Sequence, residues 1–483
     1  MDSVYKEIQS GSFYIFISKY SNIFVQILIT SILARLISPE DFGIIAISMV
    51  FILFFNQLSD IGFGVSIVQS KDLKSSDIDS FFIITFIQGI VFTVMFIIAI
   101  PFITSFYGIN EISNILLVLS ISIFFYCINT VPNALNRKSK KFKLIGIVTV
   151  ITNLITGVFA VIMAYFAHAE IYALVYKIIL DGIIIFILNL KVSGYKPHFT
   201  FSFEPIRRDL KYTTFQFLYS FIYYFSRNID NMVIGKFLGA TPLGFYDKAY
   251  KLMVMPVQNL SNVISPVLHP VLSDINDDKN NISKIYLNII KLLALIGFPL
   301  SVYLFFVAKE LILILFGNGW EKSISSFKFL ALSVGFQIIL SSTRGVFQAV
   351  GKTKEMFFMA LLSALFFIFS LFVTVNCFHT ISAVSIGISI AYFLTFITTL
   401  YSLIGNVLEV KLIFFIKCFT NPLIISLIIF VFLSLDFINS SYILLDFLLK
   451  SIFTLFIYIL TSLFLKESLL LIIYKRVMSN FKK

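Results

Sequence analysis

Long apolar segments recur along most of the chain, and each is long enough to form a helix that crosses a membrane. Around 20 apolar residues suffice for one crossing, and the pattern predicts about fourteen crossings. The first six are expected at 13–36, 42–59, 81–104, 112–132, 144–167 and 171–190. The others are expected at 212–238, 243–272, 288–308, 324–350, 356–377, 381–404, 413–433 and 443–466. The predicted fold class is therefore an all-α polytopic membrane protein.

Basic residues gather in alternate loops, all on one side of the predicted topology. They include Arg137, Lys138, Lys140, Lys141, Lys143, Lys191, Lys196, Arg207, Arg208, Lys211, Lys352, Lys354, Lys475, Arg476, Lys482 and Lys483. Loops rich in Lys and Arg remain in the cytoplasm. Both chain ends are therefore expected to be cytoplasmic, which agrees with an even number of crossings.

The sequence contains an internal repeat. Ala34–Gly43 resembles Gly235–Gly244 at an offset of 201 residues, and Ala134–Arg137 resembles Ala349–Lys352 at an offset of 215. Each block holds an even number of spans, so the two repeats are expected to be parallel and to face a central cleft. The predicted domains are an N-terminal six-helix lobe, a C-terminal six-helix lobe, and an extra helix pair with a basic tail, at 1–196, 207–406 and 411–483.

Composition excludes several functional classes. The chain is 59% hydrophobic and 13% charged, whereas soluble domains carry about 25% charged residues. No predicted loop is long enough to bury a core of its own, so the chain is not expected to be an enzyme. The net charge of +12 would favour nucleic acid as a partner of a soluble protein. Here the basic residues report orientation, so no nucleic-acid partner is expected.

No motif predicts a metal, a cofactor or a catalytic residue. The four histidines and three cysteines are scattered without ligand spacing. The sequence also lacks an ATPase-type phosphate loop and a Gly-x-Ser-x-Gly nucleophile motif.

Ionisable residues inside a span are costly and are expected to face a cavity or a partner. The seventh span carries Gln216, Tyr219, Tyr223, Arg227 and Asp230 at helical spacing, so these side chains share one face. The functional interpretation is that Arg227 presents a cation to an anionic substrate, while Asp230 restrains it or binds a coupling ion. The alternative is a structural ion pair between packed helices.

Two other spans carry related polar faces. Lys248 and Lys251 share a face of the eighth span, and they either line a cavity or extend to the membrane interface. Lys19, Asn22 and Gln26 share a face of the first span, and the offset of 201 aligns Gln26 with Arg227. In the sixth span, by contrast, Lys177 and Asp181 are expected to form a pair that stabilises the helix.

Matching polar stripes occur in the tenth and fourth spans. The tenth span carries Gln337, Ser341, Arg344 and Gln348. Subtracting 215 gives Ser122, Tyr126, Asn129 and Asn133 in the fourth. This coincidence favours a shared cavity, although Ser and Asn also bridge membrane helices, and Arg344 is also explained as a residue of the cytoplasmic end.

The predicted cavity is cationic and rich in amides. Its residues are Lys19, Asn22, Gln26, Asn129, Tyr223, Arg227, Asp230, Lys248, Lys251, Gln337 and Arg344. Arg and Lys bind phosphate, Arg through a bidentate fork, and amides and tyrosines suit sugars. A lipid pyrophosphate that carries a sugar chain fits such a lining.

Two segments resemble a known family. ILARLISPEDFGIIAISMVFILFFNQLSDIGFGVSIVQ, at Ile32–Gln69, and Asp230–Ser273 resemble the opening helix hairpins of the two lobes of Wzx-type polysaccharide flippases. These belong to the multidrug/oligosaccharidyl-lipid/polysaccharide exporter superfamily. The resemblance covers about residues 5–410. It implies a V-shaped cleft between two six-helix bundles and alternating access, with Arg227, Asp230, Lys248 and Lys251 on the helices that line the cavity.

The resemblance also implies a function and a location. The expected cargo is an oligosaccharide repeat on undecaprenyl diphosphate, moved from the cytoplasmic to the periplasmic leaflet of a bacterial inner membrane for O-antigen, capsule or exopolysaccharide synthesis. The expected partners are this lipid-linked oligosaccharide and membrane lipids, with a polysaccharide polymerase and chain-length proteins as further candidates. Two alternatives stay open, a cation-coupled multidrug exporter and a membrane-embedded polysaccharide polymerase or ligase.

Overall fold

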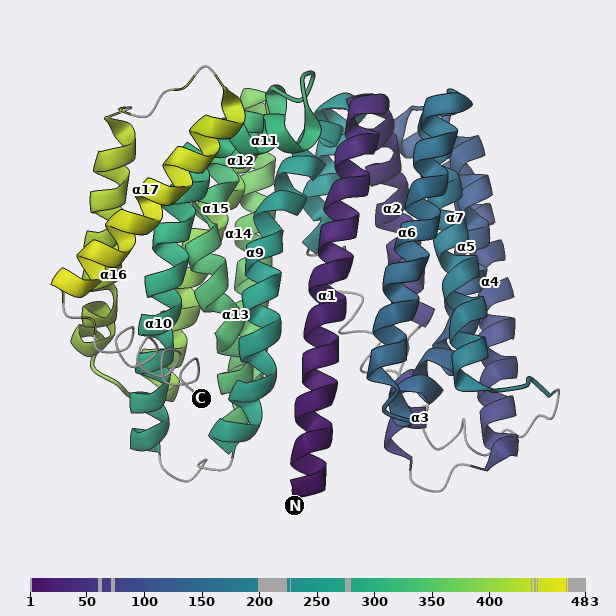
Figure 1. The fold of residues 1–483 in the computed structure, drawn as a ribbon, viewed down its shortest axis with the longest axis horizontal. Coiled ribbons are helices and arrows are strands. Elements are labelled where there is room, and N and C mark those ends of the chain that lie inside the picture. The colour runs from purple at the N-terminus through teal and green to yellow at the C-terminus, as the bar shows by residue number, and fades with distance from the viewer. Residues whose placement is uncertain are drawn as a thin grey trace. The chain divides into compact units, whose positions relative to one another are not determined.

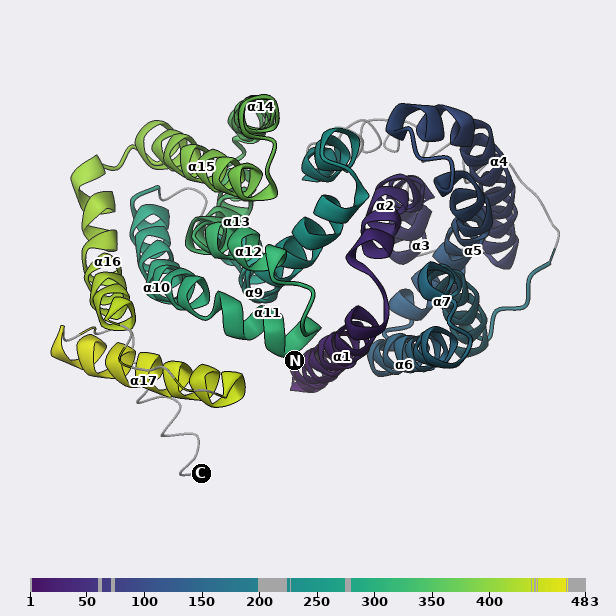
Figure 2. The ribbon, with the colours of Figure 1, turned by 90° about the horizontal axis from the view of Figure 1, so that it is seen from above.

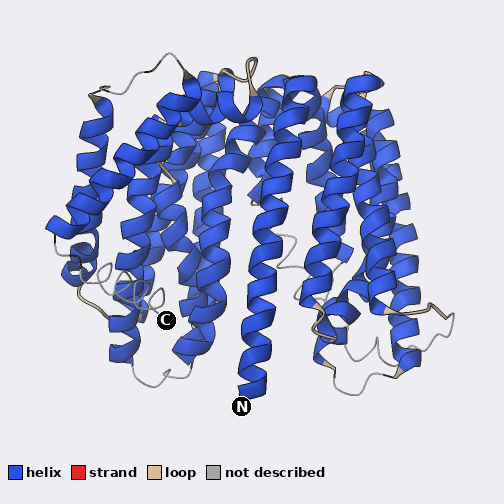
Figure 3. Ribbon diagram, viewed as in Figure 1, coloured by secondary structure: helices blue, strands red, loops and turns tan. Residues whose placement is uncertain are grey.

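The computed structural model describes residues 2–59, 63–70, 74–198, 224–225, 227–273, 279–435, 437, 440, 442–465 and 467. These residues form helices joined by short connections, and no strand occurs among them (Figure 3). The predicted all-helical fold class is confirmed. The chain divides into two compact units, Met1–Gly244 and Phe245–Lys483. The finer division into 1–196, 207–406 and 411–483 stays a prediction.

The first unit is a bundle in which α5 packs against five other helices. Its helices are α1 (Asp2–Leu36), α2 (Pro39–Ser59), α3 (Phe63–Gln69), α4 (Ser75–Tyr107), α5 (Ile112–Lys138), α6 (Phe142–Phe166) and α7 (Glu170–Ser193) (Figure 1). Residues 227–237 are also helical and precede α9 (Ala240–Ser273). Seen end-on, α4, α5, α7, α6 and α1 follow one another as packed neighbours (Figure 2). Helix α5 also contacts α2 and α3.

The second unit is built around α10 and α15. It contains α9 from Phe245 onward, followed by α10 (Lys279–Phe306), α11 (Ala308–Phe316), α12 (Lys322–Ala331), α13 (Val334–Ala349), α14 (Thr353–Phe378), α15 (Ile381–Leu400), the π-helical η1 (Tyr401–Val407), α16 (Leu412–Ser434) and α17 (Ile443–Phe464). Helix α10 packs on α13 and α16, and α15 packs on α12, α13 and α14. The buried side chains of Leu295, Ile425, Ile429 and Leu433 join α10 to α16.

Eleven helices among the described residues are long and apolar enough to cross a membrane, or twelve if α12 and α13 form one bent span. The exposed faces are apolar, as a lipid environment requires: Phe369 and Phe372 of α14 are 69% and 67% exposed. The chain is thus a multi-pass membrane protein. The exact number of fourteen stays a prediction, because part of 212–238 lies outside the described residues and α9 is not among the eleven.

The tenth predicted span, 324–350, is broken rather than continuous. Helices α12 and α13 meet at an angle of 50°. The backbone N–H of Gly335, just after the break, donates to Ser301 Oγ of α10 at 2.7 Å. A side chain that bonds to a backbone group freed at the break is a physical cause of such a bend. Here that side chain belongs to Ser301 of α10, which lies outside the span 324–350.

The repeated motif forms the same local structure twice. Helix α2 begins at Pro39 and α9 begins at Ala240, which are 201 residues apart. A proline suits the first position of a helix. Ser38 caps α2, since its Oγ accepts from the Asp41 backbone N–H at 3.1 Å and donates to Asp41 Oδ2 at 2.7 Å. The two helix starts lie against each other within the first unit, through Gly43 and Gly244.

Candidate functional site

The predicted site residues of the first span lie on α1. Lys19 and Asn22 are half-buried, and Gln26 is exposed. Asn22 Oδ1 accepts a hydrogen bond of 2.6 Å from Asn153 Nδ2 of α6. The two helices approach closely there, because a Cβ at Gly157 of α6 would lie 1.9 Å from an α1 side chain. Asn22 therefore takes part in the contact between α1 and α6.

The predicted residues of the seventh span differ in exposure. Tyr223 lies outside the described residues. Arg227 is exposed, whereas Asp230 is only 5% exposed. Asp230 Oδ1 accepts a hydrogen bond of 2.9 Å from the backbone N–H of Asn231. The roles of Arg227 in substrate binding and of Asp230 in ion coupling stay predictions.

The predicted lysines of α9 lie in different environments. Lys248 is buried, with 5% exposure. The side chain of Lys251 is 60% exposed, and its Nζ forms an ion pair of 2.7 Å with Asp247 Oδ2 one turn earlier. Asp247 itself is buried, with 5% exposure, whereas the ammonium of Lys251 keeps most of its contact with the surroundings. Lys248 is thus the more costly of the two charges to place.

The predicted residues of α13 also separate. Gln337 is buried, and its Nε2 donates to Ser333 Oγ at 2.8 Å and to Met253 Sδ of α9 at 2.9 Å. Arg344 is exposed. Gln337 therefore links α13 to α9, and its place in a substrate cavity stays a prediction.

A polar cavity lies in the first unit, between α2, α3 and α5. Its volume is ≈ 350 Å³, and it is lined by Asn56, Ser59, Gly64, Val68, Tyr126, Asn129, Thr130, Asn133, Ala134 and Arg137. Six of these side chains carry an amide, a hydroxyl or a phenol, and Arg137 carries a guanidinium. Of the described lining residues, none is acidic. The cavity therefore favours a neutral or anionic polar ligand over a cation.

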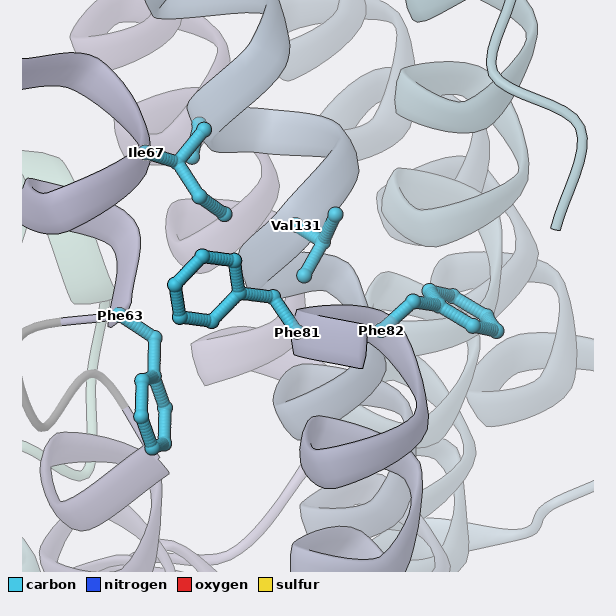
Figure 4. Close-up of a cluster of buried hydrophobic side chains, with 6 residues drawn as sticks. Phe63, Ile67, Phe81, Phe82 and Val131 are labelled. Carbon is cyan, nitrogen blue, oxygen red and sulfur yellow. The ribbon is translucent and has the colours of Figure 1, made fainter. Parts of the chain in front are cut away.

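Helix α3 forms one wall of this cavity, and a hydrophobic cluster holds it in place. Phe63 and Ile67, on one side of α3, pack with Phe81 and Phe82 of α4 and Val131 of α5 (Figure 4). All five are at most 8% exposed. The next residue after each of these two, Gly64 and Val68, lines the cavity instead. The short helix is thus fixed by burial on one side and faces the cavity on the other.

A buried amide network supports the α5 wall. Asn189 of α7 donates from Nδ2 to Asn129 Oδ1 at 3.0 Å. Asn136 Nδ2 in turn donates to the Asn189 carbonyl at 3.1 Å. All three asparagines are at most 7% exposed. Hydrogen bonds between buried amides fix side-chain orientation, so Asn189 positions Asn129 at the cavity.

Three cations near the end of α5 have different surroundings. Lys138 Nζ donates to the Ser70 carbonyl, just after α3, at 2.7 Å. Lys141 Nζ donates to the Val192 carbonyl, in the last turn of α7, also at 2.7 Å. Both lysines thus satisfy carbonyls at helix ends. Arg137 lines the cavity.

Part of the polar stripe of the fourth predicted span lies at this cavity, and its role in binding a substrate stays a prediction. Tyr126, Asn129 and Asn133 of the fourth-span stripe all line it. Ser122 donates instead to the Leu119 carbonyl of its own helix at 2.6 Å. Arg137 was explained by topology alone, yet it continues the stripe by one further step of four residues. Asn56, Ser59 and Thr130 carried no signal, because single amides and hydroxyls in apolar spans are common packing residues.

The described residues contain no group of three or more His, Cys, Asp and Glu side chains that could hold a metal ion.

The sequence is similar to a known protein family and to several characterised relatives. Residues 32–325 match the family model described as polysaccharide biosynthesis protein. The teichuronic acid biosynthesis protein TuaB of Bacillus subtilis (strain 168) is 23% identical over 361 residues, 74% of each chain. The lipopolysaccharide biosynthesis protein WzxC of Escherichia coli (strain K12) is 23% identical over 312 residues, 62% of each chain.

Solved structures share the fold at low identity. The lipid II flippase MurJ, in its inward closed conformation, gives a TM-score of 0.74 at 17% identity and covers 94% of this chain and 99% of MurJ. An inward-facing multidrug resistance MATE family transporter of the MOP superfamily gives a TM-score of 0.65 at 15% identity, covering 78% of this chain and 92% of that one. The residues matched by the family model include those that line the polar cavity. They also include Ile32–Gln69 and Asp230–Ser273, the two segments that resemble Wzx-type flippases.

Proposed function

The chain belongs to the polysaccharide biosynthesis protein family, and on this premise we propose that it is a flippase for a lipid-linked oligosaccharide. The proposed cargo is one oligosaccharide repeat on undecaprenyl diphosphate. Alternating access moves it from the cytoplasmic to the periplasmic leaflet, for the synthesis of an O-antigen, a capsule or an exopolysaccharide.

The observation that carries this proposal is the family match in a chain built of membrane-crossing helices. Eleven described helices can each cross a bilayer. A protein of polysaccharide synthesis with this architecture is suited to move an intermediate across the membrane. The shared fold with MurJ, a lipid II flippase, supports the same step.

The physical task is to carry a diphosphate past the hydrocarbon of the bilayer. A charge in that region costs several kcal/mol unless protein groups replace its water. Arginine and lysine provide charge-assisted hydrogen bonds to phosphate. Arg227, Lys248 and Arg344 are the cations we propose for this role, and Asp230 is the proposed site of coupling to an ion.

The proposed location is the bacterial cytoplasmic membrane, with both chain ends in the cytoplasm. The distribution of Lys and Arg among the loops supports this orientation. A polymerase and a chain-length protein are proposed partners, since the exported repeat must be joined to others. We propose no catalytic role for the chain itself, and the transporter fold supports this.

A cation-coupled multidrug exporter is the second candidate, and the shared fold with a MATE transporter favours it. An exporter of organic cations requires acidic groups at its binding site. Among the described lining residues of the cavity in the first unit, no side chain is acidic. This chemistry favours an anionic cargo.

Deletion of the gene tests the proposal. We expect the loss of one surface polysaccharide and the accumulation of its lipid-linked repeat, with unchanged resistance to cationic dyes. Re-expression of Arg227→Ala or Arg344→Ala should leave the protein inserted but fail to restore the polysaccharide. The control Lys191→Ala removes an exposed cation from the end of α7 and should restore it. Normal polysaccharide in the deletion strain, with increased dye sensitivity, would instead support the exporter.

A further inference from the structure

The cavity between α2, α3 and α5 has the size and the chemistry of a small-ligand site. Its ≈ 350 Å³ lie at the lower end of the range of about 300–1,000 Å³ that ligand pockets occupy. That volume suits one sugar with a phosphate and is too small for an oligosaccharide. Its lining changes from exposed Arg137 to Asn129, which is 7% exposed. The charged and the neutral polar groups are thus at different depths.

We propose that this cavity binds a glycosyl phosphate, and specifically the phosphate-bearing first sugar of the lipid-linked cargo. This inference rests on the proposed function and names the part of the cargo that this cavity recognises. Arg137 binds the phosphate, because its planar fork matches two phosphate oxygens. The amides of Asn133 and Asn129 bind sugar hydroxyls, since an amide both donates and accepts hydrogen bonds.

An unpartnered buried acceptor supports a hydroxyl-bearing ligand. Asn56 lines the cavity, and its Oδ1 is buried without a hydrogen-bond partner in the described structure. Such a group costs about 1–3 kcal/mol when left unsatisfied. Rotation of the Asn56 side chain would turn this buried oxygen toward the cavity, where a sugar hydroxyl would donate to it. Tyr126 adds a phenol to the wall, and an aromatic ring provides a surface on which a sugar ring can stack.

The alternative explanation of Arg137 is structural. A cation in the last turn of a helix stabilises the helix dipole, and basic residues of loops orient the chain. Lys138 and Lys141, however, already donate to carbonyls at the ends of neighbouring helices. Position 137 differs from both because it lines a cavity whose other polar groups suit a sugar.

Ligand binding to the purified full-length protein in lipid nanodiscs tests the site. The probes are glucose 1-phosphate, glucose, inorganic phosphate and undecaprenyl phosphate without a sugar. We expect glucose 1-phosphate to bind more tightly than either glucose or phosphate. Arg137→Gln should weaken its binding by about tenfold or more, because a charge-assisted bond is lost. Asn133→Leu should weaken the binding of glucose 1-phosphate but leave the binding of inorganic phosphate unchanged.

The control is Lys191→Gln, which removes a cation from the end of α7 and should bind glucose 1-phosphate as the wild type does. Equal binding by Arg137→Gln and the wild type would overturn the site. Tight binding of undecaprenyl phosphate that Asn133→Leu leaves intact would also overturn it, since recognition would then rest on the lipid.

A cellular assay separates this inference from the proposed function. If deletion of the gene abolishes a surface polysaccharide and Arg137→Gln restores it fully, the chain is a flippase but the cavity is not its headgroup site. If deletion leaves every surface polysaccharide unchanged, the proposed function fails, whatever the cavity binds. If Arg137→Gln fails to restore the polysaccharide and Arg137→Lys restores it in part, the result supports both the proposed function and the cavity as the headgroup site.

Discussion

The contact between the starts of α2 and α9 depends on two glycines that the internal repeat relates. A methyl group at Gly43 would lie 1.8 Å from the Ala240 carbonyl oxygen. A methyl group at Gly244 would lie 1.8 Å from the Pro39 carbonyl oxygen. Each glycine therefore faces the first residue of the other helix, and the same offset of 201 relates both pairs. We predict that alanine at either position destabilises the protein.

The size of the effect follows from the geometry. Ordinary contact begins at 3.4 Å, so a methyl group 1.8 Å from the oxygen requires the helices to part by about 1.6 Å (3.4 Å minus 1.8 Å). The neighbouring atom belongs to the backbone and cannot rotate away. Overpacking costs about 1–3 kcal/mol, and a rigid neighbour favours the upper limit. Alanine regains about 1 kcal/mol of helix propensity, so each substitution should cost roughly 2 kcal/mol.

Unfolding of the purified variants in detergent measures this cost. Gly43→Ala and Gly244→Ala should lose helicity at lower temperature than the wild type. The matched control is Gly405→Ala in η1, where an added methyl group meets nothing within 4 Å. This control should unfold at the wild-type temperature or slightly above it.

The double variant provides the sharper test. One parting of the helices accommodates both methyl groups, so the two costs should not add, and coupling of about 0.5–3 kcal/mol is expected for groups in contact. A Gly43→Ala variant as stable as Gly405→Ala would refute the close approach. Fully additive costs would refute the idea that both glycines serve one contact.

Two further predictions concern buried polar contacts. Lys450→Met should lower the free energy of unfolding by about 3–5 kcal/mol in the same unfolding assay. Lys450 Nζ bridges Glu310 Oε1 at 2.6 Å and Asp446 Oδ2 at 3.0 Å. Removal of this ammonium leaves two buried carboxylates without their shared cation. A cost under about 1 kcal/mol, typical of exposed pairs, would contradict this. Tyr195→Phe should speed amide exchange after α7 by about tenfold or more. Tyr195 Oη donates to Asp79 Oδ1 at 2.6 Å, and a hydrogen bond to a charged group contributes about 1.5–3 kcal/mol. Exchange at the wild-type rate would show that this bond does not hold the segment.

The fold could be predicted from the sequence because hydrophobic length and charge distribution act locally. The helix starts at Pro39 and Ala240 follow from small and turn-forming residues at the repeated motif. The pair of Lys177 and Asp181 is confirmed, at 2.7 Å. The break between α12 and α13 could not be predicted from this span, since its partner, Ser301, lies on α10.

The site was harder to predict for a related reason. Helical spacing shows which residues share a face, but it does not show what that face meets. Asn22 and Asn129 occupy similar polar faces in the sequence, yet Asn22 bonds to α6 while Asn129 lines a cavity. The difference arises from α3, a short helix that the apolar pattern did not indicate and that closes the cavity wall.

The end of α5 shows why a count of basic residues does not determine their roles. Arg137, Lys138 and Lys141 all satisfy the positive-inside rule, and that rule treats them as equivalent. In the structure, each of the two lysines donates a hydrogen bond from its ammonium to one carbonyl oxygen. It places the arginine at a cavity, where a planar fork can bind two oxygens of one phosphate. The residue types therefore match the geometry of their surroundings, and exchanging Arg137 for lysine should weaken phosphate binding while leaving the net charge, and with it the orientation of the chain, unchanged.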